Sequence, residues 1–109
     1  VVLGRVDDVV VSGGVKVPAT AVAARLRAHP RLAAAEVTGV ADDEWGQRVV
    51  AVVVVADPAA APTREELRDF VSAVHPRAWA PRDVVVVGEI PLLGNGKVDR
   101  TALERIAAR

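Results

Sequence analysis

The chain of 109 residues contains no cysteine, and chemistry that depends on thiols is therefore excluded. It can form no disulfide, offer no thiolate metal ligand and use no cysteine nucleophile, and this composition is compatible with a reducing cytoplasm. The histidines are His29 and His75, and each precedes a proline at the end of an expected helix. We expect them to cap the last helical carbonyl groups. No His/Asp/Glu cluster has metal-ligand spacing, so no metal site is expected.

A surplus of charge is also lacking, because 14 basic residues balance 14 acidic residues and the formal net charge is +0. There is thus no broad electrostatic reason to expect a nucleic acid or membrane partner. The longest apolar run, residues 49–56, is far too short to span a bilayer, and no signal-peptide pattern opens the chain. We expect a soluble, cytoplasmic protein. The chain begins without methionine in a strand-like run, and we expect it to be part of a longer protein.

Lysine is scarce, since Lys16 and Lys97 are the lysines among the 14 basic residues. Each lies within two residues of a glycine, in the stretches GGVK and GNGK. Arginine is a planar, permanently charged fork, whereas lysine is a compact charge on a flexible stem. Each lysine therefore marks a candidate site for one reaching ammonium group. The alternative is that a compositional bias towards arginine leaves two lysines at solvated turn positions.

Periodicity and turn signals predict a small α+β domain. Two β-prone runs, 9–11 and 15–17, flank a Ser-Gly-Gly turn and predict a β-hairpin. A short helix is expected over 18–28, with Val22 and Leu26 on its apolar face. Strands are expected at 35–40, 47–56 and 84–87. The strand at 47–56 is apolar on both faces and should lie centrally, covered on both sides, and the one at 84–87 should also be buried.

Two further helices have recognisable starts. Thr63 and Glu66 form a capping box, and the stripe that follows is Leu67, Phe70, Val71 and Val74. Asp99 can cap a last helix that carries Leu103 and Ile106. The expected fold is a small three-stranded sheet with helices packed on its faces, preceded by the hairpin.

The GNGK stretch does not match a phosphate-binding P-loop. Pro91 stands where the first glycine would be, and Val98 replaces the serine or threonine that coordinates magnesium. Residues 91–97 instead predict an exposed loop that delivers one ammonium group. Trp45 is interpreted as a packing residue. Trp79 has the same interpretation, with the alternative that it lies beside a nucleotide phosphate between Arg77 and Arg82.

Three segments in this order resemble the C-terminal lid domain of the adenylate-forming superfamily: GRVDDVVVSGGVKV, VTGVADDEWGQRVVAVVV and PLLGNGKVDRTAL. This superfamily includes acyl-CoA synthetases, peptide-synthetase adenylation domains and luciferases. The resemblance implies that residues 1–109 are one lid domain, with a hinge region at 1–8, the hairpin at 9–17 and an α+β body at 18–109. It also implies that the large N-terminal catalytic domain lies outside these residues and that the fragment alone is inactive.

The resemblance further implies a reaction and roles for individual residues. The intact enzyme would convert a carboxylic acid and ATP with Mg²⁺ into an acyl-adenylate, and then form a thioester with coenzyme A. Lys97 would be catalytic, bridging the carboxylate and the α-phosphate during adenylation. Asp7 matches the hinge position about which the lid rotates, and Arg5 matches the arginine that approaches the nucleotide.

In the second lid orientation, Gly13 and Gly14 would line the pantetheine tunnel, and Arg82 would contact coenzyme A. Ala78 and Ala80 replace the aromatic and basic pair that holds the adenine in some CoA ligases. The SGG turn favours coenzyme A over a carrier-protein thiol. With the alanine-rich first helix, it is most similar to o-succinylbenzoate–CoA ligases of menaquinone biosynthesis.

Other interpretations remain open. The chain can be the lid of a fatty-acyl or other acyl-CoA ligase, or of an adenylation domain. It can also be a free-standing module that docks on a carrier protein or a separate ligase body. In a third interpretation it is a structural domain in which GNGK has no catalytic role.

Overall fold

The computed structural model describes residues 9–108. Asp7 and Arg5, the expected hinge and nucleotide-binding residues, lie outside the described residues. The elements in chain order are β1 (Val9–Ser12), β2 (Val15–Pro18), α1 (Ala19–Arg27), β3 (Leu32–Asp42), β4 (Gly46–Val55), η2 (Pro58–Ala60), α2 (Arg64–Ser72), η3 (Arg77–Trp79), β5 (Asp83–Val86) and α3 (Arg100–Ala107).

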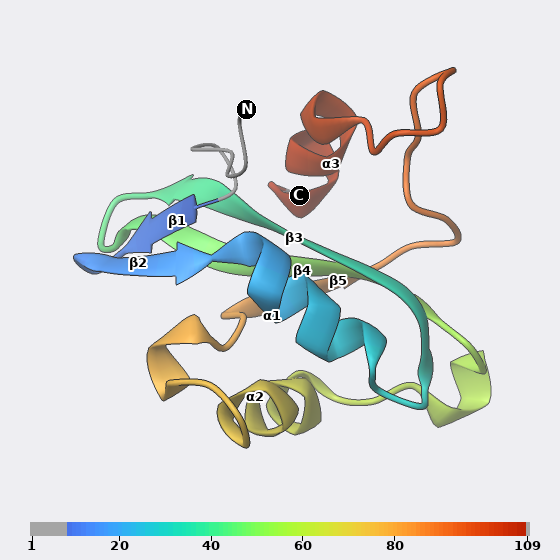
Figure 1. Ribbon diagram of the computed structural model, residues 1–109, viewed down its shortest axis with the longest axis horizontal. Helices are drawn as coiled ribbons and strands as arrows, with labels where there is room; N and C mark the ends of the chain where they lie inside the picture. The colour runs from blue at the N-terminus through green and yellow to red at the C-terminus, as the bar shows by residue number, and fades with distance from the viewer. Residues whose placement is uncertain (1–8, 109) are drawn as a thin grey trace, which may run out of the picture.

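The main sheet has the strand order β3-β4-β5, with β3 antiparallel and β5 parallel to β4. β1 and β2 form a separate antiparallel hairpin. Helices α1 and α2 lie on one face of the main sheet and α3 lies on the other (Figure 1). This arrangement confirms the predicted α+β fold.

Strand β4 is the centre of the core, as its sequence predicts. Val49, Ala51 and Val53 belong to the apolar cluster on the α1 and α2 side, whereas Val50 and Val52 belong to the cluster on the α3 side. Alternate side chains of a strand point to opposite faces, so a strand buried on both faces is apolar throughout. The partner residues in the two clusters include Val22, Leu26, Leu67 and Val71 on one side and Leu103 and Ala107 on the other.

The strand predicted at 84–87 is not a buried strand. β5 is an edge strand that pairs with β4 alone among the described residues, and the Val86 side chain is 60% exposed. β3 is longer than the predicted range 35–40, because it pairs along the length of β4, from Leu32 opposite Val55 to Asp42 opposite Gly46. Neither the edge position nor the extent of pairing is encoded in the local run of apolar residues.

The predicted helix caps are confirmed. The Thr63 hydroxyl accepts a hydrogen bond from the Glu66 N–H at 3.1 Å, and the Glu66 carboxylate accepts one from the Thr63 N–H at 2.9 Å. Asp99 accepts a hydrogen bond from the Ala102 N–H at 3.1 Å. Val74, predicted to lie in the stripe of α2, follows the end of the helix and is 59% exposed.

None of the helices in residues 9–108 has the length and apolarity needed to cross a lipid bilayer.

Candidate functional site

The Lys97 loop, residues 91–99, is a closed turn whose backbone is held at several points. Leu92 and Val98 form an isolated antiparallel bridge, and the Leu93 N–H donates to the Lys97 carbonyl at 2.7 Å. The Asn95 side chain accepts a hydrogen bond from the Lys97 N–H at 3.1 Å. Gly96 has a φ of +85°, a conformation that disfavours residues with a side chain. The asparagine and the glycine thus fix the backbone from which the lysine side chain extends.

The Lys97 side chain is exposed beside an open hollow of about 530 Å³ at the start of α3. The lining residues are Leu93, Gly96, Lys97, Val98, Asp99, Arg100 and Thr101. Lys97 forms no ion pair with a carboxylate of residues 9–108. An unpaired ammonium beside a concave surface can approach an anionic group supplied from outside this domain.

Gly13 and Gly14 form the turn of the β1–β2 hairpin, with φ values of +59° and +81°. Two successive positive φ values are typical of a type I′ turn, which matches the twist of a hairpin. The Gly13 N–H donates to the Trp45 carbonyl at 2.8 Å, and a Cβ added at Gly13 would lie 2.7 Å from Trp45 Cε3. A Cβ at Gly14 would meet nothing within 4 Å. The turn therefore packs on Trp45 through Gly13 and is open at Gly14.

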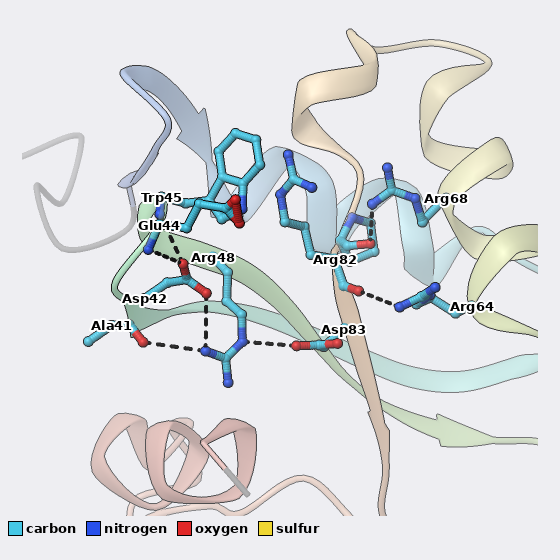
Figure 2. A network of polar contacts seen from close by, with 10 residues as sticks. Ala41, Asp42, Glu44, Trp45, Arg48, Arg64, Arg68, Arg82 and Asp83 are labelled. Atoms are coloured by element: carbon cyan, nitrogen blue, oxygen red, sulfur yellow. Dashed lines mark hydrogen bonds and ion pairs between the residues drawn. The ribbon is translucent and has the colours of Figure 1, made fainter.

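Trp45 connects the hairpin turn to Arg82. The Arg82 guanidinium lies over the Trp45 ring, 3.8 Å from its centroid, and Figure 2 shows the two side chains next to each other. A cation over an indole ring is attracted by the negative face of the aromatic system. Gly13 and Arg82, predicted from resemblance to contact coenzyme A, are thus brought together through a residue that the sequence analysis had assigned to packing.

The turn between β3 and β4 positions Trp45. One oxygen of the Asp42 carboxylate accepts hydrogen bonds from the N–H groups of Glu44 and Trp45, at 2.8 and 2.9 Å. These backbone hydrogen bonds are the main cause of the lowered pKa of Asp42, and Arg48 lowers it further. Arg48 lies 3.6 Å from Asp42 and bonds Asp83 on β5 at 2.9 Å (Figure 2). Arg48 therefore links the turn that carries Trp45 to the strand that follows Arg82.

The ring that Arg82 meets is that of Trp45, and Trp79 packs in the structure as predicted. Its ring stacks on His75 at 4.9 Å and packs partly against the core. Arg77 instead pairs with Asp69 at 2.7 Å. Distance along the chain could not show that Trp45, on a different loop, is the ring that Arg82 meets.

The His29 ring makes contacts other than the predicted cap. His29 Nδ1 accepts a hydrogen bond from the Arg31 N–H at 3.1 Å, and its ring meets Phe70 edge-on at 4.7 Å. Burial, and then the nearby positive charge of Arg31, lower the pKa of His29. The Nδ1 that accepts this hydrogen bond is therefore not a donor to the helical carbonyl groups. Within residues 9–108, His, Asp and Glu side chains nowhere gather in a group able to hold a metal ion.

The Lys97 loop and the hairpin turn lie at opposite ends of the molecule. In Figure 1 the hairpin turn is at the far left, and the orange loop between β5 and α3 is at the upper right. The residues predicted for catalysis and for coenzyme A binding therefore do not form one site within this domain.

Comparisons with known proteins show the family of the chain. The family described as "AMP-binding enzyme C-terminal domain" matches residues 21–97. Over 104 residues the chain is 46% identical to a probable 2-succinylbenzoate–CoA ligase of Mycobacterium tuberculosis, covering 95% of this chain and 27% of that protein. It is 41% identical to a 4-chlorobenzoate–CoA ligase of Pseudomonas sp., covering 94% of this chain and 20% of that protein. The chain thus spans about a quarter or less of these curated relatives.

Solved structures give the same result. The amide bond synthetase McbA of Marinactinospora thermotolerans superposes with a TM-score of 0.88 at 34% identity, covering 98% of this chain and 22% of that one. An acyl-CoA synthetase of Brucella canis superposes with a TM-score of 0.83 at 33% identity, covering 94% of this chain and 19% of that one. The resemblance found in the sequence is confirmed, and the chain belongs to the AMP-binding enzyme C-terminal domain family.

Proposed function

We propose that this chain is the lid domain of an ATP-dependent carboxylic acid–CoA ligase and that it presents two different ends to the catalytic domain in turn. Lys97 serves the formation of the acyl-adenylate, and the hairpin turn with Arg82 serves the formation of the thioester. The observation that carries the proposal is the placement of the hairpin turn and the Lys97 loop at opposite ends of the domain (Figure 1). A single active site can meet only one of them at a time, so the domain must turn between the two steps.

In the first step, Lys97 offsets the repulsion between the carboxylate of the acid and the α-phosphate of MgATP. An ammonium about 4 Å from a developing negative charge contributes about 4 kcal/mol at an effective dielectric constant near 20. If this contact is made mainly in the transition state, it corresponds to about three decades of rate. The fixed backbone of residues 95–97 and the flexible side chain suit a group that must arrive and then leave.

In the second step, the turn at Gly13 and Gly14 lets the pantetheine arm pass, because neither residue carries a side chain. The open space around Gly14 and the cationic edge made by Arg82 over Trp45 support this assignment. Asp7 is proposed as the hinge residue and Arg5 as a residue that approaches the nucleotide, both from the family resemblance. We propose that the enzyme acts in the cytoplasm.

For the acid, we propose 2-succinylbenzoate, which places the enzyme in menaquinone biosynthesis. The support is the 46% identity to the probable 2-succinylbenzoate–CoA ligase, compared with 41% for the 4-chlorobenzoate–CoA ligase. In the enzyme that joins this domain to its catalytic domain, 2-succinylbenzoate should drive exchange of pyrophosphate into ATP. Exchange with 4-chlorobenzoate or malonate but not with 2-succinylbenzoate would show another acyl-CoA ligase.

The same exchange assay tests the role of Lys97. Lys97→Ala should slow acid-dependent pyrophosphate exchange by about three decades, because the charge that bridges the reactants is lost. Lys16→Ala is the matched control, since it removes the other lysine, which is exposed on β2. An equal, small effect of both substitutions would contradict the catalytic assignment and favour a lid in which GNGK is only a turn.

A further inference from the structure

The β1–β2 hairpin is not a part of the main sheet, so its position does not follow from the pairing of β3, β4 and β5. In Figure 1 the hairpin lies beside the ends of β3 and β4 that the turn at 43–45 joins. Val10 and Val17 anchor the hairpin in the apolar core. Apolar contacts are not directional, so a hairpin held by them alone can slide along the sheet. A directional contact is needed to fix the place of its turn.

Gln47, near the start of β4, supplies such a contact. Its side-chain oxygen Oε1 accepts a hydrogen bond from the Val11 N–H at 3.0 Å. In a hairpin with a two-residue turn, the residues that flank the turn exchange hydrogen bonds, and the next pair outward does not. Val11 belongs to that next pair, opposite Lys16, so its N–H points away from β2. Gln47 therefore binds the outer edge of the hairpin, close to its turn.

Gly39 on β3 leaves room for the Gln47 amide, which is half-buried. A Cβ added at Gly39 would lie 2.9 Å from Gln47 Nε2 and 3.0 Å from Val10 Cγ1. Both distances are shorter than ordinary contacts between carbon or nitrogen atoms, so a side chain here would displace the amide. The amide thus occupies a space between β3 and β1 that exists because residue 39 is a glycine.

A second hydrogen bond holds the same edge of the hairpin. The Gly13 N–H donates to the Trp45 carbonyl at 2.8 Å, and the Trp45 ring lies against Gly13. Gln47 and Trp45 therefore bind alternate residues of one edge, Val11 and Gly13. A slip of the hairpin by one residue would break both hydrogen bonds, so together they fix its register on the sheet.

We propose that Gln47 is a positioning residue for thioester formation, because its amide fixes the hairpin on the sheet and hence the place of the turn at Gly13 and Gly14. This inference rests on the proposed function of that turn. Loss of the Oε1 acceptor would leave the Val11 N–H unpaired and allow the turn to move. The Lys97 loop, at the opposite end of the domain, would be unaffected (Figure 1). The reaction with coenzyme A should therefore depend on Gln47, and acyl-adenylate formation should not.

The first part of the test is amide hydrogen exchange in the 109-residue chain. Gln47→Met removes the acceptor at nearly constant side-chain length and should speed exchange of the Val11 amide by about fivefold, the equivalent of one hydrogen bond. Gln47→Glu keeps an oxygen acceptor and should keep the Val11 amide protected. Exchange as slow in Gln47→Met as in the unchanged chain, or as fast in Gln47→Glu as in Gln47→Met, would overturn the proposal.

The second part measures both half-reactions in the enzyme that joins this domain to its catalytic domain. Gln47→Met should raise the KM for coenzyme A by about fivefold in the reaction of preformed acyl-adenylate, and leave the kcat of acyl-adenylate formation unchanged. Gly39→Ala should have the same effect, because it displaces the Gln47 amide. Gly88→Ala is the matched control, since a Cβ at Gly88 meets nothing within 4 Å and its φ is not positive.

An unchanged KM for coenzyme A in Gln47→Met, or an equal loss in both half-reactions, would show that Gln47 does not position the turn for this step. Failure of the proposed function gives a different result. In that case even the unchanged enzyme forms no thioester with coenzyme A, whereas the exchange rates of the Val11 amide still show whether Gln47 holds the hairpin.

Discussion

Asp42 holds the backbone of the turn that carries Trp45, and Trp45 in turn contacts Arg82. Its carboxylate holds the backbone N–H groups of Glu44 and Trp45, and Trp45 in turn supports Gly13 and the Arg82 guanidinium. One charged group therefore positions the residues proposed to meet coenzyme A. Its effect should be visible in the pH dependence of stability.

The lowered pKa of Asp42 predicts a loss of stability in acid. A carboxyl group whose pKa is lower in the folded state than its ordinary value of 3.8 contributes stability above that value. The contribution is lost as the pH falls below 3.8 towards the folded-state pKa. The free energy of unfolding of Asp42→Asn, measured in urea from pH 2 to 7, should therefore fall less steeply below about pH 4 than that of the unchanged chain.

Asp43→Asn is the control, because Asp43 is adjacent and exposed and makes none of these hydrogen bonds. If both variants lose the same part of the acid dependence, Asp42 does not organise the turn.

Single residues also show what the sequence could and could not predict about the site. Lys97, Gly13, Gly14 and Arg82 are proposed as site residues because their local motifs resemble those of the family. The role of Trp45 was missed, because the stack on Arg82 joins two loops that are distant in the chain and become neighbours only through the pairing of β4 with β5. The DDEWG sequence could have indicated a fixed position for Trp45, since the first aspartate, Asp42, can accept a hydrogen bond from the backbone N–H of the tryptophan.

At the scale of elements, local sequence patterns predicted whether a segment is helix or strand more accurately than they predicted which elements lie beside it. The capping box of α2 and the aspartate cap of α3 were correct because a cap involves residues within one turn of the helix. The burial of β5 was wrong because an edge strand and a central strand can both be runs of valine. Their difference depends on which strands and helices lie beside them.

The contrast between β4 and β5 predicts different costs for the same substitution. Val52 on β4 is opposite Val85 on β5 and fully buried, whereas Val86 is 60% exposed. Val52→Ala should lower the free energy of unfolding by about 2 kcal/mol, from lost burial and the cavity that remains. Val86→Ala should change it by less than about 0.5 kcal/mol.

Chemical denaturation of the two variants measures both values. Similar losses of free energy of unfolding in the two variants would contradict the exposed position of Val86 on the edge strand β5.

At the scale of the whole molecule, the domain is a sheet covered by helices on both faces, with the Lys97 loop and the hairpin turn at opposite ends (Figure 1). α1 and α2 bury one face of the sheet and α3 buries the other, and the central strand β4 contributes to both clusters. This packing keeps the Lys97 loop and the hairpin turn apart (Figure 1). We propose that the domain, acting as a lid, presents one end and then the other by rotating as a unit, without any change in its internal structure.

The use of two opposite ends in turn is tested most directly by measuring both half-reactions in two variants of the enzyme that joins this domain to its catalytic domain. One variant is Lys97→Ala. The other is Gly14→Asn, which adds a side chain in the open space of the turn at a φ that asparagine tolerates. Acyl-adenylate formation and the reaction of preformed acyl-adenylate with coenzyme A are measured in both. We predict that Lys97→Ala impairs only the first reaction, by about three decades, and that Gly14→Asn impairs only the second. Loss of both reactions in either variant would contradict the use of two opposite ends in turn.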